Sequence, residues 1–93
     1  MSSLRAAPTP NPNSLKFTAE DASFLDDGMV AIDTEAEAQD HPLGGRLFAI
    51  GGVVNVFITP RFVTVSKQDA AEWSVVKPKI ESVLDDHLSA ADE

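Results

Sequence analysis

Two histidines and fifteen carboxylates are the side chains of this 93-residue sequence that could take part in chemistry. An acid–base or nucleophilic mechanism needs a base beside a positioned partner, and the only histidines are His41, next to a predicted helix start, and His87, near a predicted helix end. A helix C-terminus favours a cation, which accounts for His87, and His41 is most simply a solvated loop residue. We therefore expect no catalytic residue and no enzymatic activity.

Metal binding through carboxylate and imidazole groups is the second possibility. Asp85, Asp86 and His87 are consecutive, and consecutive residues of a helix point in different directions. Glu81 and Asp85 lie four residues apart and share a face, but no histidine completes that pair. A solvated acidic face is the favoured interpretation. We expect no metal ligand and no bound cofactor, with weak iron binding as the alternative because oxygen-rich sites suit iron ions.

The sequence contains no cysteine, so disulfides, thiolate nucleophiles and cysteine ligands for zinc or iron–sulfur clusters are excluded. Its net charge of −8 argues against binding to nucleic acid or to an anionic membrane surface. The sequence has no apolar run of membrane-spanning length and no signal-peptide pattern. These features predict a cytoplasmic location, and the acidity is interpreted as a solubility feature, with a basic client surface as the alternative.

Four lysines stand out in this acidic sequence: Lys16, Lys67, Lys77 and Lys79. They would form a positive patch if the fold brought them together, although scattered solubilising lysines are slightly favoured. Trp73 opens an apolar helical stripe, a position that is more often a core residue than an anchor for a partner.

The first elements that would position these residues are two strands. Alternating polar and apolar residues predict a strand over Ser14–Thr18, with Leu15 and Phe17 in the core. The Asp-Gly pair at positions 27–28 predicts a tight reversal into a second strand, Met29–Asp33, so that the two strands form a hairpin or meander.

A short helix and a hairpin follow. Residues 34–39 are compatible with helix or loop, whereas Asp40 followed by Pro42 predicts a helix that continues to Ile50 and ends at a left-handed cap at Gly51-Gly52. Two β-branched runs, residues 53–59 and 62–66, are separated by Pro60-Arg61, and this pattern predicts a hairpin at the centre of the sheet.

The last element is a long helix. Asp69 and Glu72 have the spacing of a capping box, and Pro78 is expected to kink the helix or to separate its first turn. The apolar face of this helix is predicted to consist of Trp73, Val76, Ile80, Val83, Leu84 and His87.

The predicted order is strand-strand-helix-strand-strand-helix. Each helix has one apolar stripe and each strand pair one apolar face, which favours an α+β two-layer sandwich with a four-stranded, largely antiparallel sheet and two helices on one face. We expect a single domain over residues 9–88, a flexible lead-in at 1–8 and an acidic tail at 89–93.

Four segments carry a combined pattern: Thr9–Phe17, Pro42-Leu43 before Leu47–Ile50, Gly52–Phe57 with Phe62–Lys67, and Trp73 with Lys77-Pro78. Together they resemble the N-terminal domain of the Nfu, or NifU-like, scaffold family, here as a stand-alone domain. The resemblance covers about residues 9–88 and implies a part in the assembly or delivery of iron–sulfur clusters. The chain departs from the family pattern at Arg61, where an acidic residue is usual, and at Gly44, where alanine is common.

In two-domain members of that family, a Cys-x-x-Cys motif in a following domain holds the cluster. The present sequence has no such motif, so cluster ligation does not carry over. The resemblance implies instead a surface for a partner protein, and the matching residues that we assign to it are Asn11, Asn13, Lys16, Lys67, Trp73 and Lys77.

The leading hypothesis is a non-catalytic binding module that contacts an iron–sulfur scaffold, carrier or client protein, without nucleic acid and without a membrane. Two alternatives stay open. One is an iron-binding protein with carboxylate and histidine ligands, and the other is a general protein-interaction domain unrelated to iron–sulfur chemistry.

Overall fold

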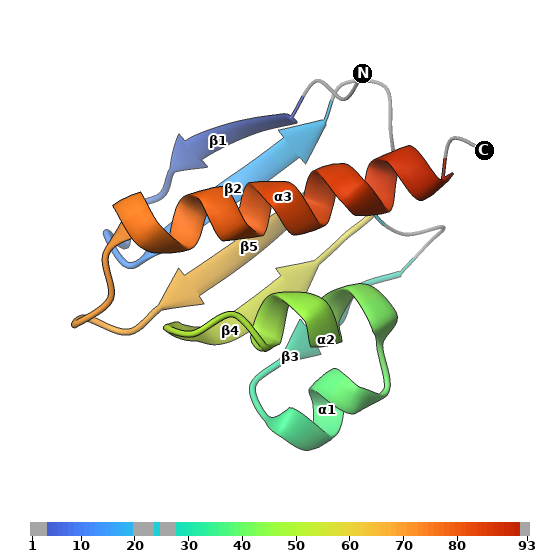
Figure 1. The fold of residues 1–93 in the computed structure, drawn as a ribbon, viewed down its shortest axis with the longest axis horizontal. Helices are drawn as coiled ribbons and strands as arrows, with labels where there is room; N and C mark the ends of the chain where they lie inside the picture. Colours follow the sequence, from blue (N-terminus) through green and yellow to red (C-terminus); the bar gives the residue numbers. More distant parts are fainter. Residues whose placement is uncertain (1–3, 20–23, 25–27, 92–93) are drawn as a thin grey trace.

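The computed structural model describes residues 4–19, 24 and 28–91. These residues form an α+β fold in which the helices lie on one face of a five-stranded sheet (Figure 1). Every neighbouring pair of strands is antiparallel, and the strand order is β1-β2-β5-β4-β3. The elements are β1 (Leu4–Pro8), β2 (Ser14–Ala19), β3 (Val30–Ile32), α1 (Glu35–Gln39), α2 (Pro42–Phe48), β4 (Val53–Ile58), β5 (Phe62–Lys67) and α3 (Trp73–Ala91).

The β4–β5 hairpin is confirmed, and β5 is the middle strand of the sheet. Its turn is closed by Thr59, whose backbone N–H donates to the Phe62 carbonyl oxygen at 2.8 Å and whose hydroxyl accepts the Phe62 N–H at 3.0 Å. Pro60 lacks a donor and Arg61 is exposed, so neither residue disturbs the ladder.

The flexible lead-in predicted for residues 1–8 is wrong over Leu4–Pro8, which forms the fifth strand and pairs with β2. Three prolines in the first twelve residues predict that this segment does not pair with a strand, because proline has no N–H to donate. An edge strand needs backbone donors on one side only, and Pro8 therefore fits at its end. The sheet consequently has five strands rather than four.

The predicted pairing between the first two strands is also wrong. β2 pairs with β1 and β5, β3 pairs with β4, and two strands separate β2 from β3. Asp26 and Asp27 of the predicted reversal lie outside the described residues. Gly28 is described and has a φ of +76°, a left-handed backbone conformation that favours glycine.

Residues 35–39, for which the sequence allowed helix or loop, form helix α1. Its N-cap is Thr34, whose hydroxyl accepts the Glu37 N–H at 3.3 Å. The Glu37 carboxylate accepts the N–H of Asp33, the residue before the cap, at 3.0 Å. These two side-chain bonds fix the chain at the start of α1 and favour a helix in so short a segment.

Helix α2 differs from the prediction at both ends. It begins after His41 rather than Asp40, and it ends at Phe48 with Ala49 as its C-cap in a right-handed conformation. The predicted left-handed cap at the glycine pair is wrong, because Gly52, with a φ of +100°, shapes the turn into β4 instead.

Helix α3 begins at Trp73, three residues after the start that the predicted capping box at Asp69 and Glu72 implies, so that prediction is wrong. The helix continues through Pro78, so its first turn is not a separate segment. Three residues at 89–91, predicted to belong to a tail, are helical. Leu88 rather than His87 completes the buried stripe, because the fully buried positions recur every fourth residue at Val76, Ile80, Leu84 and Leu88.

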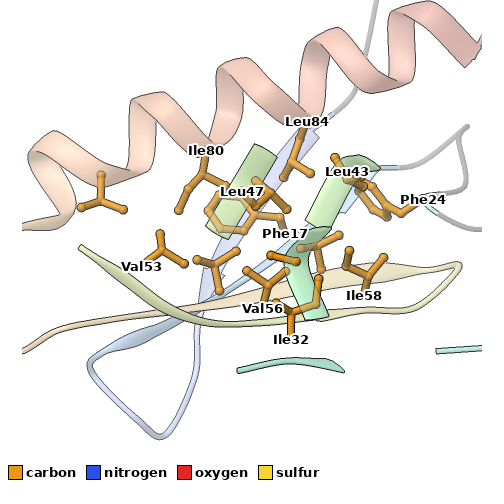
Figure 2. Packing of buried hydrophobic residues seen from close by; sticks show 14 of the residues in the cluster. Phe17, Phe24, Ile32, Leu43, Leu47, Val53, Val56, Ile58, Ile80 and Leu84 are labelled. Carbon is orange, nitrogen blue, oxygen red and sulfur yellow. The ribbon is translucent and has the colours of Figure 1, made fainter. Parts of the chain in front are cut away.

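The hydrophobic core lies between α3 and α2 on one side and the sheet on the other (Figure 2). Phe17 from β2 is fully buried as predicted, whereas Leu15 is half-buried at the margin. Within the described part of the chain, no helix combines the length and the apolar character that crossing a membrane requires.

The strands of the sheet and helix α3 run between two ends of the molecule (Figure 1). At one end three connections come together, residues 9–13, 49–52 and 68–72, and we call this the three-loop end (Figure 1). Backbone bonds join them, since the Lys67 N–H donates to the Asn13 carbonyl and the Gln68 N–H to the Gly52 carbonyl, both at 2.8 Å. Helix α3 starts at this end and runs to the opposite end, where β1 begins.

Candidate partner-binding surface

The connection between β1 and β2 is held in shape by its own side chains. Asn11 accepts the Asn13 N–H on its Oδ1 at 2.9 Å, and the Thr9 hydroxyl donates to the Asn11 carbonyl oxygen at 2.9 Å. Prolines at positions 10 and 12 restrict the backbone between these bonds. The exposed loop therefore presents a defined shape to a partner.

Lys67 is the centre of the three-loop end. Its side chain is only 9% exposed, and its Nζ donates to Asn13 Oδ1 at 3.0 Å and to the Gln68 carbonyl oxygen at 3.2 Å. The ammonium group also lies 5.6 Å from the centroid of the Trp73 ring. A buried ammonium needs such partners because it has lost its water. Lys67 therefore stabilises the three-loop end and is not one of several scattered surface lysines.

Asn13 and Trp73 extend this cluster to both sides. The Asn13 side-chain nitrogen donates to the Asp69 carboxylate, which connects the loop to the segment before α3. The indole nitrogen of Trp73 donates to the Pro12 carbonyl oxygen at 3.0 Å, and the ring is half-buried. The first turn of α3 is thus attached to the loop between β1 and β2.

The structure brings together four of the six residues predicted for the partner surface: Asn11, Asn13, Lys67 and Trp73. Lys77 lies one turn along α3 from Trp73, at the four-residue spacing that shares a helix face. Lys16 lies elsewhere. Its Nζ is 4.7 Å from the centroid of the Phe62 ring. Lys16 is exposed next to the buried Phe17 in β2, so it lies on the face of the sheet that the helices do not cover.

A groove of about 420 Å³ opens beside the three-loop end, and sequence reasoning missed it. The half-buried side chains of Phe48 and Ile50 provide apolar surface, with Glu35 and Gln39 also in the lining. The groove depends on the close approach of two short helices, because a Cβ on Gly45 would lie 2.6 Å from the Ala38 carbonyl oxygen. Such a groove can accept an apolar side chain of a partner.

His41 is not the solvated loop residue that we predicted. Its Nδ1 accepts the Gly44 N–H at 2.9 Å, so the imidazole caps helix α2. Burial of the ring, and after it the nearby His87, lowers the pKa of His41 below its usual value of 6.5. Arg46 donates to Asp86 at 2.9 Å and connects α2 to α3 in the same region.

The two histidines, which the sequence gave no reason to associate, are close enough to interact electrostatically. Within residues 4–19, 24 and 28–91, however, no group of three histidine, aspartate or glutamate side chains is placed to hold a metal ion.

Comparison with known proteins supplies the family. The sequence profile described as "Scaffold protein Nfu/NifU N terminal" matches residues 4–91. The chain is 36% identical over 87 residues to the "NFU1 iron-sulfur cluster scaffold homolog, mitochondrial" of Drosophila erecta, with 94% of this chain and 31% of that protein covered. The human protein of the same name is 36% identical over 88 residues, with 94% of this chain and 34% of that protein covered.

A solved structure agrees with the sequence match. The solution NMR structure of the NifU-like protein from Saccharomyces cerevisiae superposes with a TM-score of 0.82 at 26% identity, covering 96% of this chain and 80% of that one. The chain thus spans about a third of the length of the two curated relatives above.

The predicted cytoplasmic location is overturned by the same comparison, because both curated relatives carry the word mitochondrial in their names. The absence of a recognisable targeting pattern was a poor guide, since it rested on the first residues alone. The match over residues 4–91, together with the shared fold, shows that this chain belongs to the Nfu/NifU N-terminal family.

Proposed function

We propose that this chain is a non-catalytic binding module of iron–sulfur cluster assembly, which contacts a scaffold, carrier or client protein through the three-loop end. One observation carries the proposal: a sequence without cysteine matches the Nfu/NifU N-terminal family over residues 4–91. Family membership supports a part in the process, and the missing thiolates direct that part away from cluster ligation.

The three-loop end supports this role because it combines a rigid exposed loop with an adjacent apolar groove. Hydrogen bonds at Asn11, Lys67 and Trp73 fix the loop before any partner arrives, so little side-chain entropy is lost on binding. Phe48 and Ile50 in the groove offer apolar surface that a partner can cover.

Site-specific crosslinking tests the proposal. Because the sequence contains no native cysteine, the crosslinker reacts with the introduced cysteine alone. A photo-crosslinker is attached to Gln68→Cys, an exposed position in the three-loop end, or to Ser82→Cys, an exposed position on α3 as the matched control. We expect iron–sulfur assembly or client proteins to be captured from a lysate of the source cells through position 68 and not through position 82. Capture of unrelated proteins alone would favour a general interaction domain.

Iron binding is the second candidate, because His87 lies near enough to His41 to lower its pKa. Anaerobic titration with Fe(II), read by calorimetry, separates it from the binding module. We expect no saturable heat from the unmodified chain. Saturable binding that is lost in a His41→Asn/His87→Gln variant would transfer the function to iron binding.

A further inference from the structure

The groove beside the three-loop end is apolar inside. Helices α1 and α2 lie next to each other at the β3 and β4 side of the sheet (Figure 1), and the groove opens between them and the start of β4. The half-buried Phe48 and Ile50 belong to its lining, and a Cβ at Gly51 would find no atom within 4 Å. The groove therefore has room for an apolar side chain, whose burial removes apolar surface from water.

The rim of the groove is negative. Glu35, an exposed residue of α1, belongs to the lining, and the segment around it also contains Asp33, Glu37 and Asp40 and no basic residue. The Glu37 carboxylate accepts hydrogen bonds from the Asp33 N–H and the Thr34 hydroxyl, both of which are neutral donors. These bonds satisfy the oxygens but leave the negative charge in place.

The end of α2 contributes in the same direction, and no cation of the chain compensates. Phe48 is the last residue of α2 and Ala49 its C-cap, and both line the groove at the helix end where carbonyl groups carry partial negative charge. None of the seven basic residues belongs to the lining. Arg46 follows the lining residue Gly45, but its guanidinium donates to Asp86 of α3 at 2.9 Å. The groove is thus an apolar site with a negative rim and no positive charge of its own.

We infer that the groove binds a segment of the partner protein in which an apolar side chain is flanked by arginine or lysine. The apolar side chain covers Phe48 and Ile50, and the cation complements Glu35 and the end of α2. Arginine and lysine have long apolar stems, so the charge can reach the rim while the stem lies along the groove. The inference rests on the proposed function, because it assigns the chemistry of one partner segment to the same surface.

NMR titration of the ¹⁵N-labelled chain provides the test. The probe is a short peptide with leucine at its centre and two arginines on each side. One control peptide has serine in place of the leucine, and a second has glutamate in place of every arginine. We expect saturable shifts of the amides of residues 35–39 and 48–53 with the probe, and none with the glutamate peptide.

The serine peptide separates the groove from net charge. It should bind at least about fivefold more weakly than the probe, because it has no apolar side chain to bury. Equal binding of the two arginine peptides would overturn the inference, since attraction to an acidic protein would then explain both. Shifts confined to β1, β2 or the second half of α3 would overturn it as well.

Two variants that each remove one carboxylate sharpen the result. Glu35→Gln takes the charge from the rim and should weaken binding of the probe about threefold, the size of an exposed ion pair. Glu81→Gln removes the same charge from α3 at the four-residue spacing that continues from Trp73 and Lys77, the helix face attached to the loop between β1 and β2. It should change the dissociation constant by less than about 1.5-fold, because salt screens distant charges. Similar losses in both variants would overturn the assignment of the cation to the rim.

A third variant fills the groove. Gly51→Leu adds an apolar side chain at a lining position where the Cβ meets no atom, and it should weaken binding of the probe about tenfold by occupying the space of the peptide leucine. The urea midpoint of this variant checks that it folds, and Glu35→Gln, a change at an exposed side chain, supplies the test if it does not. An unchanged dissociation constant in a folded Gly51→Leu protein would place the peptide outside the groove.

A dilution series of the unmodified chain without peptide tests a second copy as the occupant. Concentration-dependent shifts of the amides of residues 48–53 would identify a second copy and overturn the inference. Since the peptide assay contains no iron–sulfur protein, its failure leaves the crosslinking result through position 68 intact. Conversely, capture of unrelated proteins alone by crosslinking would reject the proposed function while leaving the peptide result unchanged.

Discussion

Among single residues, Asn13 and Lys67 are the two at the three-loop end whose substitution should reduce stability most. Asn13→Ala leaves the buried ammonium without its amide acceptor and should lower the free energy of unfolding by about 1 to 3 kcal/mol. Lys67→Met keeps the aliphatic stem and removes the charge. Because the two side chains share one interaction, the losses in the double variant should be less than additive by about 1 kcal/mol. Urea unfolding of the four proteins measures this, and simple additivity would contradict the coupling.

His41 gives folding stability a dependence on pH. A neutral imidazole accepts the Gly44 N–H, and the pKa of His41 is lowered in the folded state, first by burial and then by His87. The unfolded chain therefore binds the proton more tightly, so stability is complete above pH 6.5 and decreases as the pH falls from 6.5 through the lowered folded-state pKa. Urea midpoints at pH values on both sides of this window should show the loss.

His41→Asn is the matched control for that measurement. Asparagine also caps a helix but does not titrate. The variant should therefore lose the decrease in stability that His41 causes below pH 6.5, while retaining most of the stability at high pH. His41→Ala should instead cost about 1 kcal/mol at high pH, as expected for a lost cap. An unchanged pH profile in the asparagine variant would assign the effect to another group.

Among the elements, helix α2 depends on two glycines for different reasons. A Cβ at Gly44 would collide with the end of the Ile32 side chain in β3, whereas at Gly45 it would meet the backbone of α1. Gly44→Ala alone should destabilise the protein by about 1 to 3 kcal/mol, despite the better helix propensity of alanine, because it overpacks the core. Adding Ile32→Val removes the colliding methyl group and should recover most of that loss.

Gly45→Ala provides the comparison, since no side chain can move to relieve a contact with the Ala38 carbonyl oxygen. Thermal unfolding of the single and double variants measures both effects. A Gly44→Ala protein as stable as the parent would show that Ile32 adjusts without cost.

The elements also show what sequence could predict. The β4–β5 hairpin and α3 follow from local signals, namely β-branched runs around Pro60-Arg61 and apolar residues every three or four positions. β1 and the strand order could not be predicted, because pairing between distant strands depends on contacts that no local pattern encodes. Asp40 followed by Pro42 predicts a helix start because propensity favours aspartate at the cap, whereas the actual cap depends on which side chain faces the Gly44 N–H.

How the residues proposed for the partner surface lie relative to one another depends on the same distant contacts. Family resemblance identified Asn11, Asn13, Lys67 and Trp73, and the fold brought them together. Lys16 lies three residues from Asn13 in the sequence but on the other face of the sheet, since strand alternation separates them. The groove beside Phe48 depends on how α1 packs against α2, which sequence spacing does not reveal.

For the whole molecule, the concentration of carboxylates outside the sheet predicts a response to salt. Like charges in the helices and connections repel one another, and dissolved salt weakens this repulsion by screening the charges. Raising sodium chloride from about 0.02 M to about 0.5 M should therefore raise the unfolding temperature by about 2 to 5 °C. Asp40→Asn, which removes one exposed acidic charge from the end of α1, should show a smaller rise. A lower unfolding temperature in salt would contradict repulsion as the dominant electrostatic effect.

The course of α3 determines how this protein can be handled and fused. The helix starts beside the three-loop end and carries the chain along 19 residues, about 28 Å, to the opposite end, where β1 also begins. A tag, a fluorophore or a second domain joined near the end of α3 or near the start of β1 is therefore held away from Trp73 and the groove. Immobilisation on a sensor chip through that end leaves the three-loop end directed toward the solution, and a short linker is enough.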